Sequence, residues 1–197
     1  EIIASIFKDR SPSNNKLLMQ LIISSLPTLI LGFILVDLID SFLRTSAIIA
    51  ITTIVFGVVL FAATFKTPKK MTVDEITIIE ALIIGLAQSI ALIPGTSRSG
   101  ITISTGLFLG LDNKTASRFS FLMAIPTIGA IAAYQLVSVE LNYLIQYSHV
   151  NILGLFVSFI VAYITIDFFI RFINKIGFLP FVIYRIILGL ILLMAFI

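Results

Sequence analysis

The hydrophobic positions of this chain fall into long, nearly unbroken runs that short polar segments separate. An α-helix needs about 20 mostly apolar residues to cross the ~30 Å hydrocarbon core of a bilayer, and five runs reach that length. The pattern therefore predicts an all-α integral membrane protein, a polytopic helix bundle that forms a single transmembrane domain over residues 1–197. The predicted spans are residues 17–36, 46–65, 118–137, 150–170 and 179–197.

A sixth apolar region, residues 76–111, has a polar turn near its middle, and its second half is too short to span a bilayer alone. If this region enters and leaves by one side, ten Lys and Arg residues of the loops lie on one side of the membrane and one on the other; if it crosses, the split is six and five. Because basic loops stay in the cytoplasm, we expect a re-entrant helical hairpin at residues 76–111, an inner amino terminus and an outer carboxyl terminus. The predicted cytoplasmic loops are residues 1–16, 66–75, 112–118 and 171–178, and the outer loops are residues 37–45 and 138–149.

The composition narrows the possible functions. Of the 197 residues 59% are hydrophobic and 12% are charged, and the mean hydropathy of +1.15 excludes an ordinary soluble domain. The absence of cysteine excludes a disulfide framework and a thiolate metal site. The one histidine, His149, excludes a histidine cluster, and we expect it in a solvated loop. The basic residues behind the net charge of +3 are scattered, which argues for a lipid bilayer and against nucleic acid as the partner.

The polar turn is the strongest candidate for a functional site. It reads Pro94-Gly95-Thr96-Ser97-Arg98-Ser99-Gly100 and runs directly into Ile101-Thr102. Glycines let the backbone approach a ligand closely, and a helix that begins at such a turn presents unpaired N–H groups to an anion. Arg98 adds a planar, permanently charged group that fits phosphate oxygens. The turn therefore predicts an anion site, and phosphate is the anion that fits it best.

The candidate residues at this site have different expected roles. Gly95, Thr96, Ser99 and Gly100 are expected to bind the phosphate, and Gln88 is a secondary candidate that can reach the turn from the entering half of the hairpin. Ser97 is either a nucleophile or a ligand of the phosphate, and both roles stay open. The simplest alternative is a Gly/Ser turn between two core helices, with Arg98 extending to the interface.

The stretch from Ala91 to Thr102 resembles the second signature of the undecaprenyl-diphosphate phosphatase family, the bacitracin-resistance phosphatases. The likeness continues through residues 119–126 and 178–185. The resemblance implies hydrolysis of a polyprenyl diphosphate lipid to its monophosphate in the bacterial plasma membrane, which recycles the lipid carrier of cell-wall synthesis and confers bacitracin resistance. It also implies Ser97, Arg98 and Thr102 as the catalytic residues. Broken helices around a central polar site are typical of inverted-repeat folds, of which this chain would form somewhat more than half.

One part of the family pattern has no match here. The family's first signature, a Glu-x-x-x-Glu run followed by Pro-x-Ser-Ser-x-Gly-His, has no counterpart before Lys16, so we expect that an amino-terminal repeat is missing from this sequence. The resemblance implies a divalent cation, Mg²⁺ or Ca²⁺, whose ligands come mainly from that signature, and we expect no metal ligand within this chain.

Other interpretations stay open at this point. The same arginine-bearing turn suits a transporter or flippase of polyprenyl phosphate or another anionic lipid, which would bind the head group and break no bond. A phosphatase of the phosphatidic-acid type is set aside, because it needs two histidines. Arg185, in the last predicted span, is expected to pair with Asp167 or to be structural. A homodimer is compatible with the sequence and is left open.

Overall fold

The computed structural model describes residues 12–69, 72–138 and 147–196, and these residues are helical with no β-strand. Five helices are long and apolar enough to cross a membrane, so the predicted all-α polytopic class is confirmed. The long helices are α2 (Pro12–Leu38), α3 (Ser46–Thr64), α6 (Asn113–Ser138), α8 (Ser148–Ile176) and α9 (Leu179–Phe196). The shorter helices are α4 (Ile78–Ser89) and α5 (Arg98–Phe108), with helical turns η1 (Ile39–Leu43), η2 (Val73–Glu75) and η3 (Ile90–Leu92).

The helix boundaries follow local sequence signals. Thr45 caps α3, since its hydroxyl accepts the N–H of Ile48. Thr77 and Glu80 form a capping box at the start of α4. Most of the predicted loops at residues 1–16 and 138–149 lie outside the described residues, as do residues 70–71 and 197.

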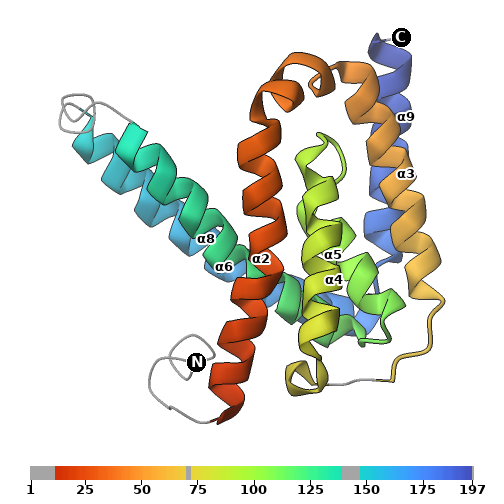
Figure 1. Ribbon diagram of the computed structural model, residues 1–197. Helices are drawn as coiled ribbons and strands as arrows, with labels where there is room; N and C mark the ends of the chain where they lie inside the picture. The colour runs from red at the N-terminus through yellow and green to blue at the C-terminus, as the bar shows by residue number, and fades with distance from the viewer. Residues whose placement is uncertain (1–11, 70–71, 139–146, 197) are drawn as a thin grey trace.

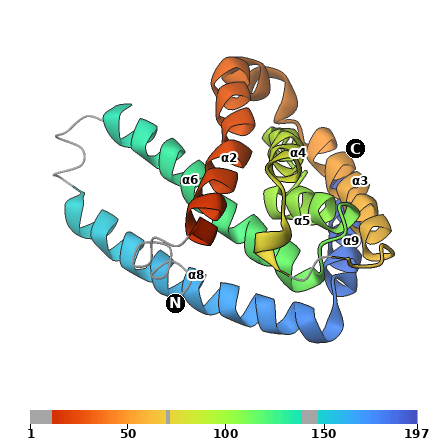
Figure 2. The same cartoon turned by 60° about the horizontal axis from the view of Figure 1, so that its bottom comes forward.

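The helices α4 and α5 form a hairpin that α2 and α3 flank on its two sides, with α9 packed along α3 (Figure 1). Both ends of the hairpin lie at the same end of the molecule, near the start of α6 (Figure 1). The two helices have 12 and 11 residues, fewer than a bilayer span requires. This is the shape expected of a re-entrant hairpin, and its depth in the bilayer stays a prediction. The pair α6 and α8 extends away from the other helices, as Figure 2 shows from a second direction.

Two glycines set the closest helix contacts. A Cβ atom at Gly85 of α4 would stand 2.2 Å from the carbonyl oxygen of Ser24 on α2, and one at Gly189 of α9 would stand 2.4 Å from Ile54 of α3. Glycine at these crossings lets the helix backbones touch, which is how helices commonly associate inside membranes. The hairpin is therefore held tightly against α2, and α3 against α9.

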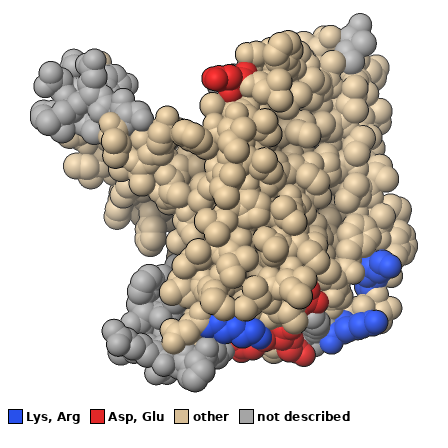
Figure 3. Space-filling view, viewed as in Figure 1, with Lys and Arg blue, Asp and Glu red and all other residues tan. Residues whose placement is uncertain are grey.

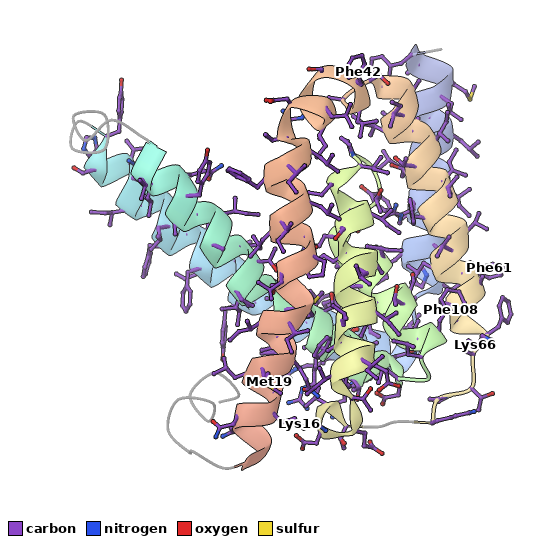
Figure 4. The ribbon with its side chains drawn as sticks, in the orientation of Figure 1. Lys16, Met19, Phe42, Phe61, Lys66 and Phe108 are labelled. Carbon is purple, nitrogen blue, oxygen red and sulfur yellow. The ribbon has the colours of Figure 1, made fainter. Side chains whose placement is uncertain are left out.

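The charged side chains on the surface are unevenly distributed. On the face shown in Figure 3 they gather at the two ends, and the band between them is uncharged. Lys16 and Lys66 lie at the end where the hairpin opens (Figure 4), and Lys16 Nζ donates to the backbone oxygen of Asp74 in η2. Many large apolar side chains of the band are exposed, such as Phe33 at 75%. A lipid-facing belt between polar ends is the surface of a multi-pass membrane protein.

Candidate anion site at the hairpin tip

The tip of the hairpin is attached to α3 by two threonine hydroxyls. Thr52 Oγ1 lies 2.6 Å from the carbonyl oxygen of Pro94, and Thr53 Oγ1 lies 3.3 Å from that of Gly95. Each hydroxyl also has a carbonyl oxygen of its own helix within reach, at 2.7 Å for Thr52 and 2.6 Å for Thr53, and its single proton is shared among these acceptors. Gly95 has a φ of +87°, in the region that favours glycine, and its Cα faces the backbone of Ile49. The hydroxyl groups of α3 therefore bind carbonyl groups on one side of the tip.

Arg185 of α9 holds the same turn from another direction. Its Nη2 donates to the carbonyl oxygens of Gly95 and Thr96 at 2.8 and 2.9 Å, and its Nε and Nη2 both reach the carbonyl oxygen of Thr53 at 3.3 Å. The side chain is 9% exposed. A buried arginine therefore joins α9, α3 and the hairpin tip through backbone acceptors.

The expected ion pair between Arg185 and Asp167 was wrong. Asp167 pairs instead with Arg171, one turn along α8, at 2.8 Å, and both side chains are largely exposed. Local spacing explains this pair, because residues four apart on a helix are neighbours. An arginine inside an apolar span must find hydrogen-bond acceptors, so the sequence does indicate that Arg185 has buried partners. It does not indicate which ones, because the acceptors are backbone carbonyl groups, which every residue type has.

Replacement of Arg185 by methionine is expected to lower the free energy of unfolding by roughly 2–4 kcal/mol, because three buried carbonyl groups lose a charged donor. Thermal unfolding in detergent measures the effect. Arg171→Met is the matched control: it removes an exposed ion pair and is expected to change stability by about 1 kcal/mol or less. Equal stability of the two variants would contradict the assignment of Arg185 to the tip.

The helix α5 begins at the tip with the geometry of an anion site. Ser97 adopts a φ of +66°, and its Oγ caps the helix by accepting the N–H of Gly100 at 3.2 Å. The next N–H, of Ile101, bonds to the carbonyl oxygen of Ser97. A Cβ atom at Gly100 would stand 3.3 Å from Nη1 of Arg185, so glycine here lets the guanidinium approach the helix start. The positive end of the helix and a cation thus meet.

A cavity of about 460 Å³ opens beside the helix start. One part of its wall is polar and the other is apolar. The polar wall consists of Thr53, Gly95, Ser97, Ser99, Gly100 and Arg185, and the apolar wall includes Leu60, Ile103, Phe169, Phe178, Phe181 and Leu188. Such a cavity fits a molecule with an anionic head and an apolar tail.

Arg98, the predicted centre of the site, points to the other side of the tip, toward α4. Its Nε donates to Oε1 of Gln88 at 2.7 Å. Its Nη2 is buried and has no hydrogen-bond partner among the described residues. A buried donor without an acceptor is costly, so Nη2 is a candidate to donate to an anionic oxygen.

Two of the predicted residues have internal roles. Thr102 is 2% exposed, and its Oγ1 bonds to the carbonyl oxygen of Arg98 and to Ser120 Oγ of α6 at 2.7 Å. Thr96 is fully buried, with its carbonyl oxygen bound by Arg185. The structure therefore brings Gly95, Ser97, Ser99 and Gly100 to the cavity, connects Arg98 with Gln88, and turns Thr96 and Thr102 inward.

Comparison with known proteins matches residues 1–191 to the family described as bacitracin resistance protein BacA. The chain belongs to this family. Undecaprenyl-diphosphatase 1 of Pseudoalteromonas translucida is 45% identical over 180 residues, which cover 91% of this chain and 67% of that protein. The undecaprenyl-diphosphatases of Teredinibacter turnerae and Marinobacter nauticus are 47% and 44% identical over 89% and 86% of this chain. The matched segment covers 66% and 64% of those two proteins, so the chain spans about two thirds of the length of its curated relatives.

The resemblance to the bacitracin-resistance family is thus confirmed. The donor set of the site is cationic and hydroxylic: no described Asp or Glu lines the cavity, and no three His, Cys, Asp or Glu side chains among the described residues are grouped to hold a metal ion. These residues do not by themselves fit a divalent cation, which prefers carboxylate oxygens. His149 is exposed, as expected, but the prediction that it lies in a loop was wrong, because it is in the first turn of α8; it does not line the cavity.

Proposed function

We propose that the full-length protein hydrolyses undecaprenyl diphosphate to undecaprenyl monophosphate and phosphate in the bacterial plasma membrane. The relatives that cover most of this chain are named undecaprenyl-diphosphatases. The site adds a physical argument, since an anionic head group with a long apolar tail is the kind of molecule that its cavity fits. Removal of the terminal phosphate would recycle a lipid carrier of cell-wall synthesis, and it would confer bacitracin resistance.

The observation that carries the proposal is the unpaired donor of Arg98. Nη2 is buried in an apolar protein and has no acceptor among the described residues, while the start of α5 lies in the same turn. An arginine guanidinium and the N–H groups at a helix start both bind phosphate groups well. Arg98 does not line the cavity, so the head group would have to reach past the start of α5 to meet Nη2. The helix N–H groups and Arg98 would then bind the diphosphate together and stabilise the charge that gathers on the transferring phosphoryl oxygens.

The remaining residues would bind and orient. Arg185 would keep the tip rigid, with its Nη1 beside the helix start. Ser97 Oγ accepts the Gly100 N–H, so we assign Ser97 to orienting a phosphate oxygen and not to attack on phosphorus. In the reaction a water oxygen would bond to the terminal phosphorus as the bridging P–O bond breaks, and the prenyl monophosphate would leave with the bridging oxygen. The prenyl tail would lie along Phe169, Phe178 and Phe181.

The test is phosphate release from undecaprenyl diphosphate by the full-length protein in detergent, with Mg²⁺, with Ca²⁺ and with EDTA. We expect release that the chelator abolishes, since we propose that a divalent cation neutralises the diphosphate and that its ligands lie mainly outside this chain. Tight binding of the lipid without any release would overturn the hydrolase proposal and favour an anionic-lipid transporter. Release that EDTA leaves unchanged would overturn the cation proposal alone.

A further inference from the structure

A row of buried polar side chains crosses the core from α2 through α4 to α6, and Gln88 of α4 stands at its centre. Gln88 is fully buried. Its Oε1 accepts Nε of Arg98 at 2.7 Å, and its Nε2 donates to Thr28 Oγ1 of α2 at 3.0 Å and to Thr127 Oγ1 of α6 at 3.4 Å. One carboxamide therefore connects the site arginine to two neighbouring helices.

The directions of the hydrogen bonds made by the Gln88 carboxamide are fixed. Arginine has only donors, so Oε1 of Gln88 must face Arg98, and the amide nitrogen must face the threonines. Thr127 Oγ1 lies 2.9 Å from the carbonyl oxygen of Met123 and 3.0 Å from Ser25 Oγ, so it too has acceptors for its proton. Because both ends of the Gln88 carboxamide are bonded, its orientation is held and resists rearrangement.

We propose that Gln88 is the positioning residue of Arg98: it holds Nε by a neutral acceptor, so that the Nη edge faces the anion with its full positive charge. This inference rests on the proposed function, because it assigns Arg98 to the phosphate. The bonded Nε and the unpartnered Nη2 belong to the same guanidinium, so Gln88 holds one of its donors while the buried Nη2 has no partner among the described residues.

The proposal depends on the fact that the Gln88 side chain is uncharged. A carboxylate at this position would hold Nε equally well, but it would pair with the guanidinium and reduce its attraction for an anion. An apolar side chain would keep the charge but would leave Nε–H buried without an acceptor and free the side chain to change rotamer. Glutamine is the residue type that both fixes the guanidinium and preserves its charge.

The experiment compares Gln88→Met and Gln88→Glu with wild type in the full-length protein. The matched control is Gln20→Met: Gln20 is also a fully buried glutamine, but it donates to the backbone of Ile76 and is not connected to Arg98. The probes are phosphate release from farnesyl diphosphate and calorimetric binding of its non-hydrolysable methylene analogue, with thermal unfolding measured beside them.

We expect Gln88→Met to lower kcat/KM by about 10–100-fold, since a small displacement of a catalytic group has effects of this size. Gln88→Glu should keep the melting temperature of wild type and weaken binding of the analogue. Gln20→Met should keep kcat/KM. In an Arg98→Met background, Gln88→Met should weaken binding no further, because a positioning residue acts only through its partner.

Full activity of both Gln88 variants, or equal losses in Gln88→Met and Gln20→Met, would overturn the inference. So would a further loss of binding in the Arg98→Met background. If Gln88→Met failed to fold, the same binding measurement on Gln88→Glu and on Thr127→Val would test the inference. Thr127→Val removes a hydrogen-bond acceptor of the Gln88 carboxamide. If wild type bound the analogue but released no phosphate, the hydrolase proposal would fail, while the binding data would still test Gln88.

Discussion

Replacement of Arg98 by alanine is expected to reduce phosphate release from a prenyl diphosphate by about a thousandfold or more, the range reported for arginines that stabilise a transferring phosphoryl group. The side chain carries the buried, unpartnered Nη2 and has its Nε fixed by Gln88. Alanine removes both the charge and the fork. Arg98→Lys should recover little activity, because a lysine ammonium group cannot make the two parallel hydrogen bonds to a phosphate that a planar guanidinium makes.

Arg171→Ala is the control for this measurement, because it removes an arginine that is 77% exposed and distant from the tip in the chain. Its activity should equal that of wild type. Melting temperatures of the three variants in detergent show whether any loss of activity comes from unfolding. A folded Arg98→Ala protein with wild-type turnover would contradict both the site and the proposed mechanism.

Replacement of Gly95 by alanine is expected to have the second-largest effect, a loss of about 3 kcal/mol or more in stability together with most of the activity. The φ of +87° strains any L side chain. In addition, the new Cβ would stand 2.4 Å from the carbonyl oxygen of Ile49 and 2.2 Å from Thr52 Oγ1, so the tip would have to move off α3. That movement would break the bonds of Thr53 and Arg185 to the tip.

Thermal unfolding and phosphate release test this prediction, with Gly129→Ala and Gly154→Ala as controls. A Cβ atom at either control position meets nothing within 4 Å, so both variants should behave as wild type. A stable and active Gly95→Ala protein would show that the tip tolerates displacement, contrary to the packing described above.

The sequence determined the elements that depend on local chemistry. Long apolar runs have one stable form in hydrocarbon, the helix, because every backbone polar group must be bonded within its own segment. The membrane class and the five long helices follow from this, with α3 predicted at residues 46–65 and observed at Ser46–Thr64. The turn from Pro94 to Gly100 was predicted as the site because glycines, hydroxyls and an arginine at membrane depth lower stability unless they serve a function.

Tertiary structure decided which side chains of that turn meet which partners. Arg185 binds carbonyl groups up to 132 positions away, Gln88 connects helices 39 and 60 positions away, and Thr102 turns to Ser120 on α6. These partners are backbone oxygens and hydroxyls, which nearly every segment of the chain contains, so no pattern in the sequence distinguishes them. The packing of α2, α6 and α9 around the hairpin selects these partners. Close contacts at glycines set the distances between the helices and leave no room for an added side chain.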